Sequence, residues 1–150
     1  MSELLTTNFS LAEMTRTGWK LPNKPNKEEK AALTALCLDV LEPLRDLWGG
    51  PIKVNSGFRS EKVNRAVGGS PHSHHRTGNA ADIQPVGHDR LELWELILQH
   101  LPCLPIDQAI VYEGTTHIHL GTAEKPRRQL LVKTKAGNYL SWDRYKGPLK

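Results

Sequence analysis

Residues 73–82 read SHHRTGNAAD, and this stretch decides how the chain is interpreted. It carries histidines in a polar loop and then Asp82, at the start of an apolar run typical of a buried strand. Gly78 can take a turn conformation that is closed to other residues. The small side chains of Ala80 and Ala81 let the strand that carries Asp82 approach its neighbours closely. The stretch therefore predicts a turn leading into a tightly packed strand.

A second group of histidines lies further along the chain, where His117 and His119 flank Ile118. Side chains alternate along a strand, so both histidines should point to the same side of the sheet. Zinc binds imidazole and carboxylate ligands, and catalytic zinc sites use three protein ligands plus water. A loop histidine, Asp82 and a strand histidine can supply such a triad. Glu113, six residues before His119, places a carboxylate nearby as a candidate general base.

Taken together, residues 73–82 match the pattern SxHxxGxAxD at all five fixed positions. The chain therefore resembles the zinc D-alanyl-D-alanine carboxypeptidases, whose superfamily includes the hedgehog signalling domain. The resemblance extends over roughly residues 8–120 and is greatest to small phage and bacterial members. The other matching segments are NFSLAEM at 8–14, LEPLR at 41–45, SGFRS at 56–60, VN at 63–64, AVGGS at 66–70 and YEGTTHIH at 112–119.

The resemblance implies that one Zn²⁺ ion is held by His75, Asp82 and His119. It also implies that Glu113 is the catalytic base and that His117 lies beside the reacting carbonyl. Many small members carry tryptophan where this chain has His117, so both exopeptidase and endopeptidase action stay open.

The same resemblance implies that Arg59 is both a catalytic and a substrate-binding residue. It would contact either the carboxylate of the substrate or the oxyanion that develops during the reaction. Ser73 and Gln108 are additional candidates for substrate contact. The implied activity is hydrolysis of peptidoglycan stem-peptide or cross-link bonds involving D-alanine, with a phage endolysin as one possible setting. The alternative is a non-catalytic, zinc-stabilised module that binds cell wall or forms part of a virion.

The remaining pattern predicts an α+β fold of the hedgehog/DD-peptidase type, with helices packed on a central antiparallel sheet. We expect one zinc peptidase domain over residues 1–150, with a hairpin-like extension at about 121–150. Pro43 is expected to kink or interrupt the longest helix. Helices are expected at 10–17, 27–48, 60–66 and from Asp89 onward, and strands at 52–54, 80–84, 107–112, 117–120, 129–133 and 139–142.

Composition and charge limit the classes of partner that the chain is expected to bind. The 150 residues carry a net charge of +4, with basic residues spread along the chain and no motif for specific nucleic-acid binding. No apolar run is long enough for membrane insertion, and the N-terminus does not resemble a secretory signal. We expect a monomer that acts on peptidoglycan peptides, made in the cytoplasm and reaching the cell wall through a holin or a virion if it comes from a phage.

Overall fold

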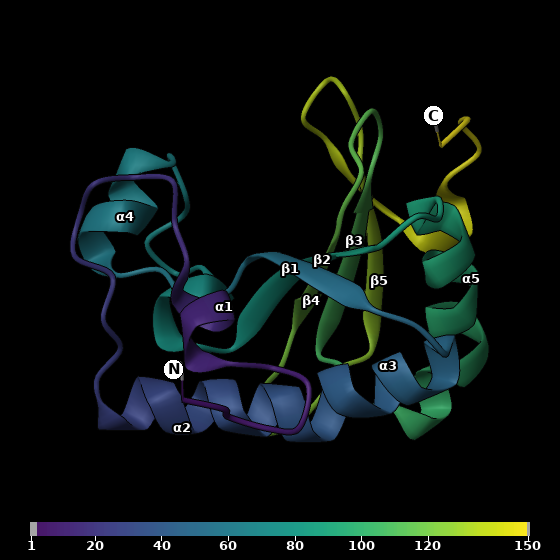
Figure 1. The fold of residues 1–150 in the computed structure, drawn as a ribbon. Coiled ribbons are helices and arrows are strands. Elements are labelled where there is room, and N and C mark those ends of the chain that lie inside the picture. The colour runs from purple at the N-terminus through teal and green to yellow at the C-terminus, as the bar shows by residue number, and fades with distance from the viewer. Residues whose placement is uncertain (1–2, 150) are drawn as a thin grey trace.

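A six-stranded sheet forms the centre of the computed structural model, which describes residues 3–149 (Figure 1). The strands lie in the order β1-β2-β4-β3-β5-β6. All neighbouring strands are antiparallel except β3 and β5, which are parallel. Their bounds are β1 Ile52–Ser56, β2 Ala80–Pro85, β3 Gln108–Tyr112, β4 Ile118–Gly121, β5 Gln129–Lys133 and β6 Tyr139–Ser141.

The expectation of a purely antiparallel sheet was therefore wrong, because the sheet is mixed. The reason lies in the connection after β4, where residues 122–128 cross the end at which β3 begins. Backbone hydrogen bonds from Arg128 to Ile106 and from Gln129 to Asp107 hold this crossing in place. β5 then starts beside the start of β3 and runs in the same direction. The predicted hairpin of β5 and β6 is confirmed, and it joins the central sheet through β5.

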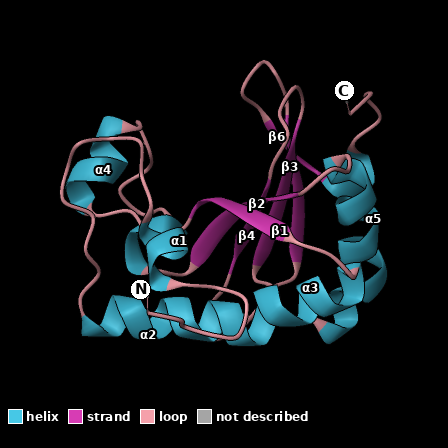
Figure 2. Cartoon of the chain, viewed as in Figure 1, coloured by secondary structure: helices cyan, strands magenta, loops and turns pink. Residues whose placement is uncertain are grey.

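Helices cover one face and the ends of the sheet (Figure 2). Three of them begin with a capping box, in which the side chains of the N-cap residue and the third helical residue each accept a hydrogen bond from the other's backbone N–H. These boxes are Ser10 with Glu13, Asn26 with Glu29, and Asp89 with Glu92. The helices are α1 Leu11–Thr15, α2 Lys27–Leu36, α3 Glu42–Trp48, α4 Glu61–Ala66 and α5 Arg90–His100.

The expected interruption at Pro43 is present just before it, where a π-helical turn, Cys37–Leu41, separates the α-helical segments α2 and α3. The N–H of Glu42 reaches back five residues to the carbonyl of Cys37. A proline has no N–H and its ring clashes with the carbonyl four residues earlier, so a wider turn before it relieves that clash. The helical stretch predicted over 27–48 is thus present, with this local change of geometry.

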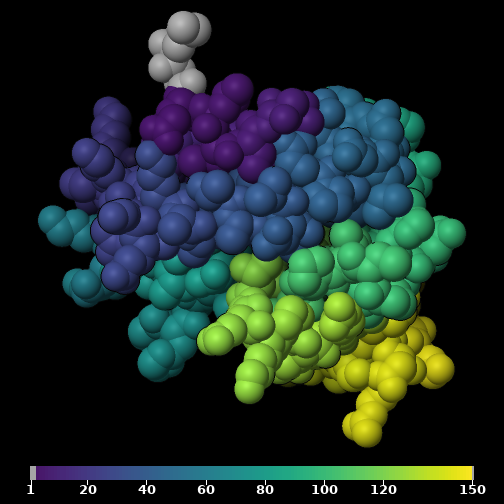
Figure 3. Space-filling model, turned by 90° about the horizontal axis from the view of Figure 1, so that it is seen from below, coloured from purple at the N-terminus to yellow at the C-terminus, as the bar shows by residue number. Residues whose placement is uncertain are grey.

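The two faces of the sheet differ in chemistry. Ala81, Ile83, Ile118, Leu120 and Val132 point to the face that packs on the helices and are almost fully buried. Their alternate neighbours point to the other face, which carries polar side chains. In the view from below, the purple and blue N-terminal third covers much of the molecule (Figure 3). Among residues 3–149, no helix combines the length and apolar character needed to cross a bilayer.

Candidate metal centre

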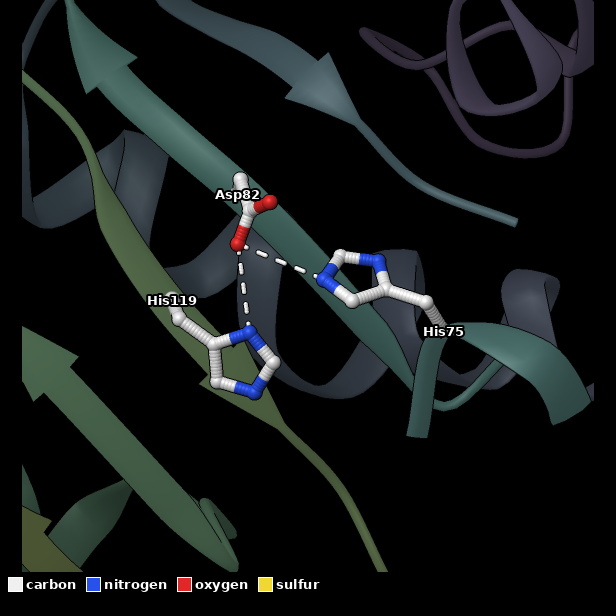
Figure 4. Close-up of side chains that lie close together, drawn as sticks. All are labelled: His75, Asp82 and His119. Atoms are coloured by element: carbon white, nitrogen blue, oxygen red, sulfur yellow. Dashed lines mark hydrogen bonds and ion pairs between the residues drawn. The ribbon is translucent and has the colours of Figure 1, made fainter. Parts of the chain in front are cut away.

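Three side chains converge on the polar face of the sheet: His75, Asp82 and His119 (Figure 4). One potential ligand atom from each lies within 4.8 Å of the other two. Oδ1 of Asp82 is 3.3 Å from Nε2 of His75 and 3.1 Å from Nδ1 of His119. All three residues are buried. The structure therefore brings together the three residues that the sequence singled out as metal ligands.

Strand register and a short turn produce this convergence. Asp82 on β2 pairs directly with His119 on β4, so both side chains leave the same face of the sheet. His75 comes from a 3₁₀ turn, His74–Thr77, which begins at Ser73 and ends at Gly78. Gly78 has a φ of +81°, the left-handed conformation expected of a glycine at this position.

The ring of His75 has a defined tautomer. Its Nδ1 lies 2.7 Å from the carbonyl oxygen of Gly57, which can only accept, so Nδ1 donates. The lone pair is therefore on Nε2, the atom that faces Asp82. This Nε2 is fully buried and has no hydrogen-bond partner among the described residues. A buried, unpaired imidazole nitrogen beside a carboxylate and a second imidazole fits a bound divalent metal.

The charges of the cluster also fit a metal. Burial opposes ionisation of Asp82, but the hydrogen bond from His119 and the adjacent ring of His75 outweigh it and hold the pKa of Asp82 well below its usual range. Burial lowers the pKa of His119, against the opposing effect of Asp82. The cluster therefore offers the carboxylate of Asp82 and, at His119, a neutral imidazole near neutral pH, the protonation states in which these groups bind metal.

The group of potential ligands comprises three side chains among residues 3–149. A tetrahedral zinc ion bound by three protein ligands keeps its fourth position for water or substrate, as in catalytic sites. His74, in the same loop, does not belong to the group, since its Nε2 faces Asp107 at 3.4 Å.

A cavity of about 440 Å³ opens over these ligands, and the three predicted substrate-contact residues all line it. Arg59 lies on its wall, where Nη2 is 3.4 Å from Oδ2 of Asp82 and Nε donates to Ser56. Ser73 lines the cavity, and its hydroxyl accepts the N–H of His75. Gln108 lines it from β3 and donates to Gln129.

His117 lies just before β4, two residues before His119, and it belongs neither to the ligand group nor to the residues that line the cavity. Its ring contacts that of Tyr112, with the centroids 4.7 Å apart. Burial lowers the pKa of His117, so its imidazole is neutral near neutral pH.

Glu113 is placed differently from what its spacing suggested. It belongs neither to the ligand group nor to the residues that line the cavity. Its carboxylate accepts hydrogen bonds from the N–H of Lys135 and the hydroxyl of Tyr145. Tyr112 ends β3 and lines the cavity, whereas Glu113 begins the turn after β3, and its hydrogen bonds direct it toward the C-terminal segment.

Sequence reasoning missed several residues of the cavity wall, among them Tyr112, Lys133 and Tyr139. Alternation along β3 from Gln108 could have identified Tyr112. Nothing local could have identified Lys133 and Tyr139, because they reach the cavity through the parallel pairing of β5 with β3.

Comparison with known proteins agrees with this geometry. The sequence profile of the family described as Peptidase M15 matches residues 7–121. The zinc D-Ala-D-Ala carboxypeptidase of Streptomyces albus G is 37% identical over 79 residues. The aligned segment makes up 51% of this chain and 31% of that protein, so the chain matches about a third of its relative's length.

Proposed function

Because the chain belongs to the peptidase M15 family, we propose that it is a zinc-dependent peptidase that hydrolyses peptidoglycan stem peptides at a bond involving D-alanine. The observation that carries this proposal is the buried, unpaired Nε2 of His75, which faces Asp82 and His119. The named activity of the Streptomyces relative supports the substrate class. We further propose that it acts on the cell wall as a phage endolysin.

In this proposal His75, Asp82 and His119 hold the zinc ion. Zinc in such a site polarises a carbonyl group and lowers the pKa of a bound water toward ~7. Gly57 fixes the ring of His75 through its carbonyl oxygen, 2.7 Å from Nδ1. Orienting partners of this kind typically affect metal affinity or activity by about 10–100-fold.

Arg59 is proposed to bind the terminal carboxylate of the substrate. Its guanidinium is partly engaged by Asp82 and Asn64 at 3.4 Å each, distances that leave donor capacity for a carboxylate. A guanidinium can bind both oxygens of a carboxylate at once. Ser73 and Gln108, on the same cavity wall, are proposed to contact the peptide backbone.

Two residues are candidates for the proton transfer. The resemblance assigns it to Glu113, whose carboxylate would have to leave Tyr145 and Lys135 to reach the metal centre. Closeness in the chain favours His117, which is neutral near neutral pH and stands two residues before His119. Glu113→Gln and His117→Gln are both expected to keep zinc. The variant that loses turnover identifies the residue that transfers the proton. Loss of such a residue typically lowers kcat by about 10²–10⁴-fold.

The proposal is tested by incubating zinc-loaded protein with purified cell walls and identifying the released muropeptides and free D-alanine by mass spectrometry. His75→Ala is expected to lose both zinc and activity. His88→Ala is the matched control, since this histidine is exposed and belongs to no ligand group. A wild-type protein that binds zinc and cell wall without releasing any product would instead support the non-catalytic binding module. Full zinc content in His75→Ala would remove that residue from the ligand set.

A further inference from the structure

Building on the proposed peptidase function, we propose that Lys133 is a second anion-recognition point of the cleft. It selects peptides that carry a carboxylate upstream of the scissile bond, in addition to the terminal carboxylate. Lys133 ends β5, beyond the segment 7–121 that matches the peptidase family. The proposal thus assigns part of the substrate specificity to a segment outside the family match.

Register places Lys133 on the wall of the metal cavity. It pairs with Tyr112 of β3 and with Tyr139 of β6, so these three side chains leave the same face of the sheet. All three line the cavity that also contains the metal ligands. The side chain is half-buried, and its position is therefore fixed by the sheet rather than by a loose surface loop.

Among residues 3–149, the ammonium group of Lys133 has no anionic partner. Its Nζ lies 5.2 Å from the centre of the Tyr139 ring, a cation–π contact. Within residues 3–149, no carboxylate lies within ion-pair distance of it. A lysine beside a cleft that is held by an aromatic ring and lacks a counter-ion is available to a ligand carboxylate.

The other charged groups of the cavity do not neutralise the positive charge of Lys133. The one carboxylate on the cavity wall belongs to Asp82, which is already engaged by His75, His119 and Arg59. Among the described residues that line the wall, Arg59 and Lys133 are the permanent cations, and a divalent ion held by His75, Asp82 and His119 would add further positive charge. The cleft is therefore suited to a peptide with more than one negative charge.

The spacing of these cations matches a short peptide. Arg59 contacts Asp82 on β2, and Lys133 lies on β5, three strand positions away. Neighbouring strands are about 4.8 Å apart, so the two strands are separated by about 14 Å, the length of roughly four extended residues. From β4, which carries His119, to β5 the separation is about 10 Å, or roughly three residues. The second carboxylate is therefore expected two or three residues before the scissile bond.

The test uses N-acetylated peptides that end in D-Ala-D-Ala, with glutamate or glutamine at the second or third residue before the scissile bond. We expect the zinc-loaded wild type to prefer the glutamate peptide by about fivefold in kcat/KM at low salt, and the preference to shrink as salt is added. Lys133→Gln is expected to abolish the preference, and Lys133→Arg to retain it. Lys125→Gln, the same charge change at an exposed position away from the cavity, is the matched control and is expected to keep it.

A second measurement separates this inference from the proposed function. Binding of the same peptides to metal-free protein is followed by NMR titration, where no hydrolysis interferes. Stronger binding of the glutamate peptide that is lost in Lys133→Gln supports the role of Lys133 even if no peptide is cleaved. Equal affinity for both peptides in wild type, or an unchanged preference in Lys133→Gln, would overturn it.

Discussion

At the scale of single residues, Gly78 shapes the backbone between His75 and Asp82. Its φ is +81°, and a Cβ at this position would lie 2.5 Å from the carbonyl oxygen of Glu29 in α2. Gly78→Ala is therefore expected to destabilise the fold by about 2–4 kcal/mol, from the left-handed conformation plus the overlap with fixed backbone. Urea unfolding measures the change.

Gly87 provides the matched control for that substitution. Its φ is +77°, but a Cβ there meets no atom within 4 Å. Gly87→Ala should therefore show the conformational cost alone, about 1–2 kcal/mol. Equal losses of stability in both variants would mean that the contact with α2 relaxes freely, contrary to the close packing inferred at Gly78.

Tyr145 controls the ionisation of Glu113. The hydrogen bond from the Tyr145 hydroxyl is the main cause that holds the pKa of Glu113 below its usual value, followed by the N–H of Lys135. Tyr145→Phe removes the hydroxyl, so the pKa of Glu113 should rise toward that of an ordinary glutamate. An NMR titration of the glutamate side chains measures this shift, and Tyr139→Phe, which does not touch Glu113, should leave it unchanged. The acid limb of the pH profile of kcat/KM shifts to higher pH together with the pKa of Glu113 only if Glu113 is the catalytic base.

At the scale of secondary-structure elements, Asp107 ties the start of β3 to the segment that leads into β5. Its buried carboxylate accepts hydrogen bonds from the backbone N, Nε and Nη2 of Arg127, at 3.0, 3.0 and 2.9 Å. Nε2 of His74 lies 3.4 Å away, so the contact also reaches the loop that carries His75. The side chain of Arg127 is more than half exposed, which limits the strength of the pair.

Asp107→Asn is expected to lower the free energy of unfolding by about 1–2 kcal/mol at pH 7. The hydrogen bond from Arg127 is the main cause that depresses the pKa of Asp107 in the folded protein. Its contribution is therefore present above the unfolded pKa near 4 and is lost as pH falls through the lower folded value. Urea unfolding at pH 7 and pH 3 should show the difference between wild type and variant shrinking at low pH. Asp46→Asn, at an exposed position of α3, should show little difference at either pH.

The elements that were predicted correctly are those with local signals. The helix starts at Asn26 and Asp89 follow from capping boxes, because both partners lie within four residues of each other. The convergence of Asp82 and His119 followed from a motif and strand alternation. The parallel pairing of β5 depends on which strand edge the chain reaches after residue 121, and nothing in the sequence of β5 specifies that edge. Lys133 was missed for this reason, and the π-helical turn before Pro43 was missed because it is one of several ways to accommodate a proline.

At the scale of the whole molecule, the segment that matches the family ends where the sheet is still incomplete. Residues 7–121 include β1 to β4, but β3 would then have an open edge where β5 pairs with it in the full chain. β5 buries Val132 completely against the core. Beyond β6, the Trp142 ring packs edge-on against Trp94 of α5, with the centroids 5.4 Å apart. The last thirty residues thus complete the core as well as the cleft.

Truncation after residue 121 is therefore expected to abolish cooperative folding, although it keeps all three candidate metal ligands. Losing the burial of Val132 removes about 2 kcal/mol, and losing the partly buried Trp142 with its ring contact to Trp94 removes roughly a further 2–4 kcal/mol. Their sum is comparable with the total stability of a small domain, about 5–15 kcal/mol, and the exposed edge of β3 favours aggregation. Truncation after residue 145 keeps β5, β6 and Trp142 and should unfold near the temperature of the full chain. Thermal melts followed by circular dichroism, with size-exclusion chromatography, compare the three proteins. A cooperative melt of the shorter fragment within a few degrees of the full chain would mean that the family-matched segment folds by itself.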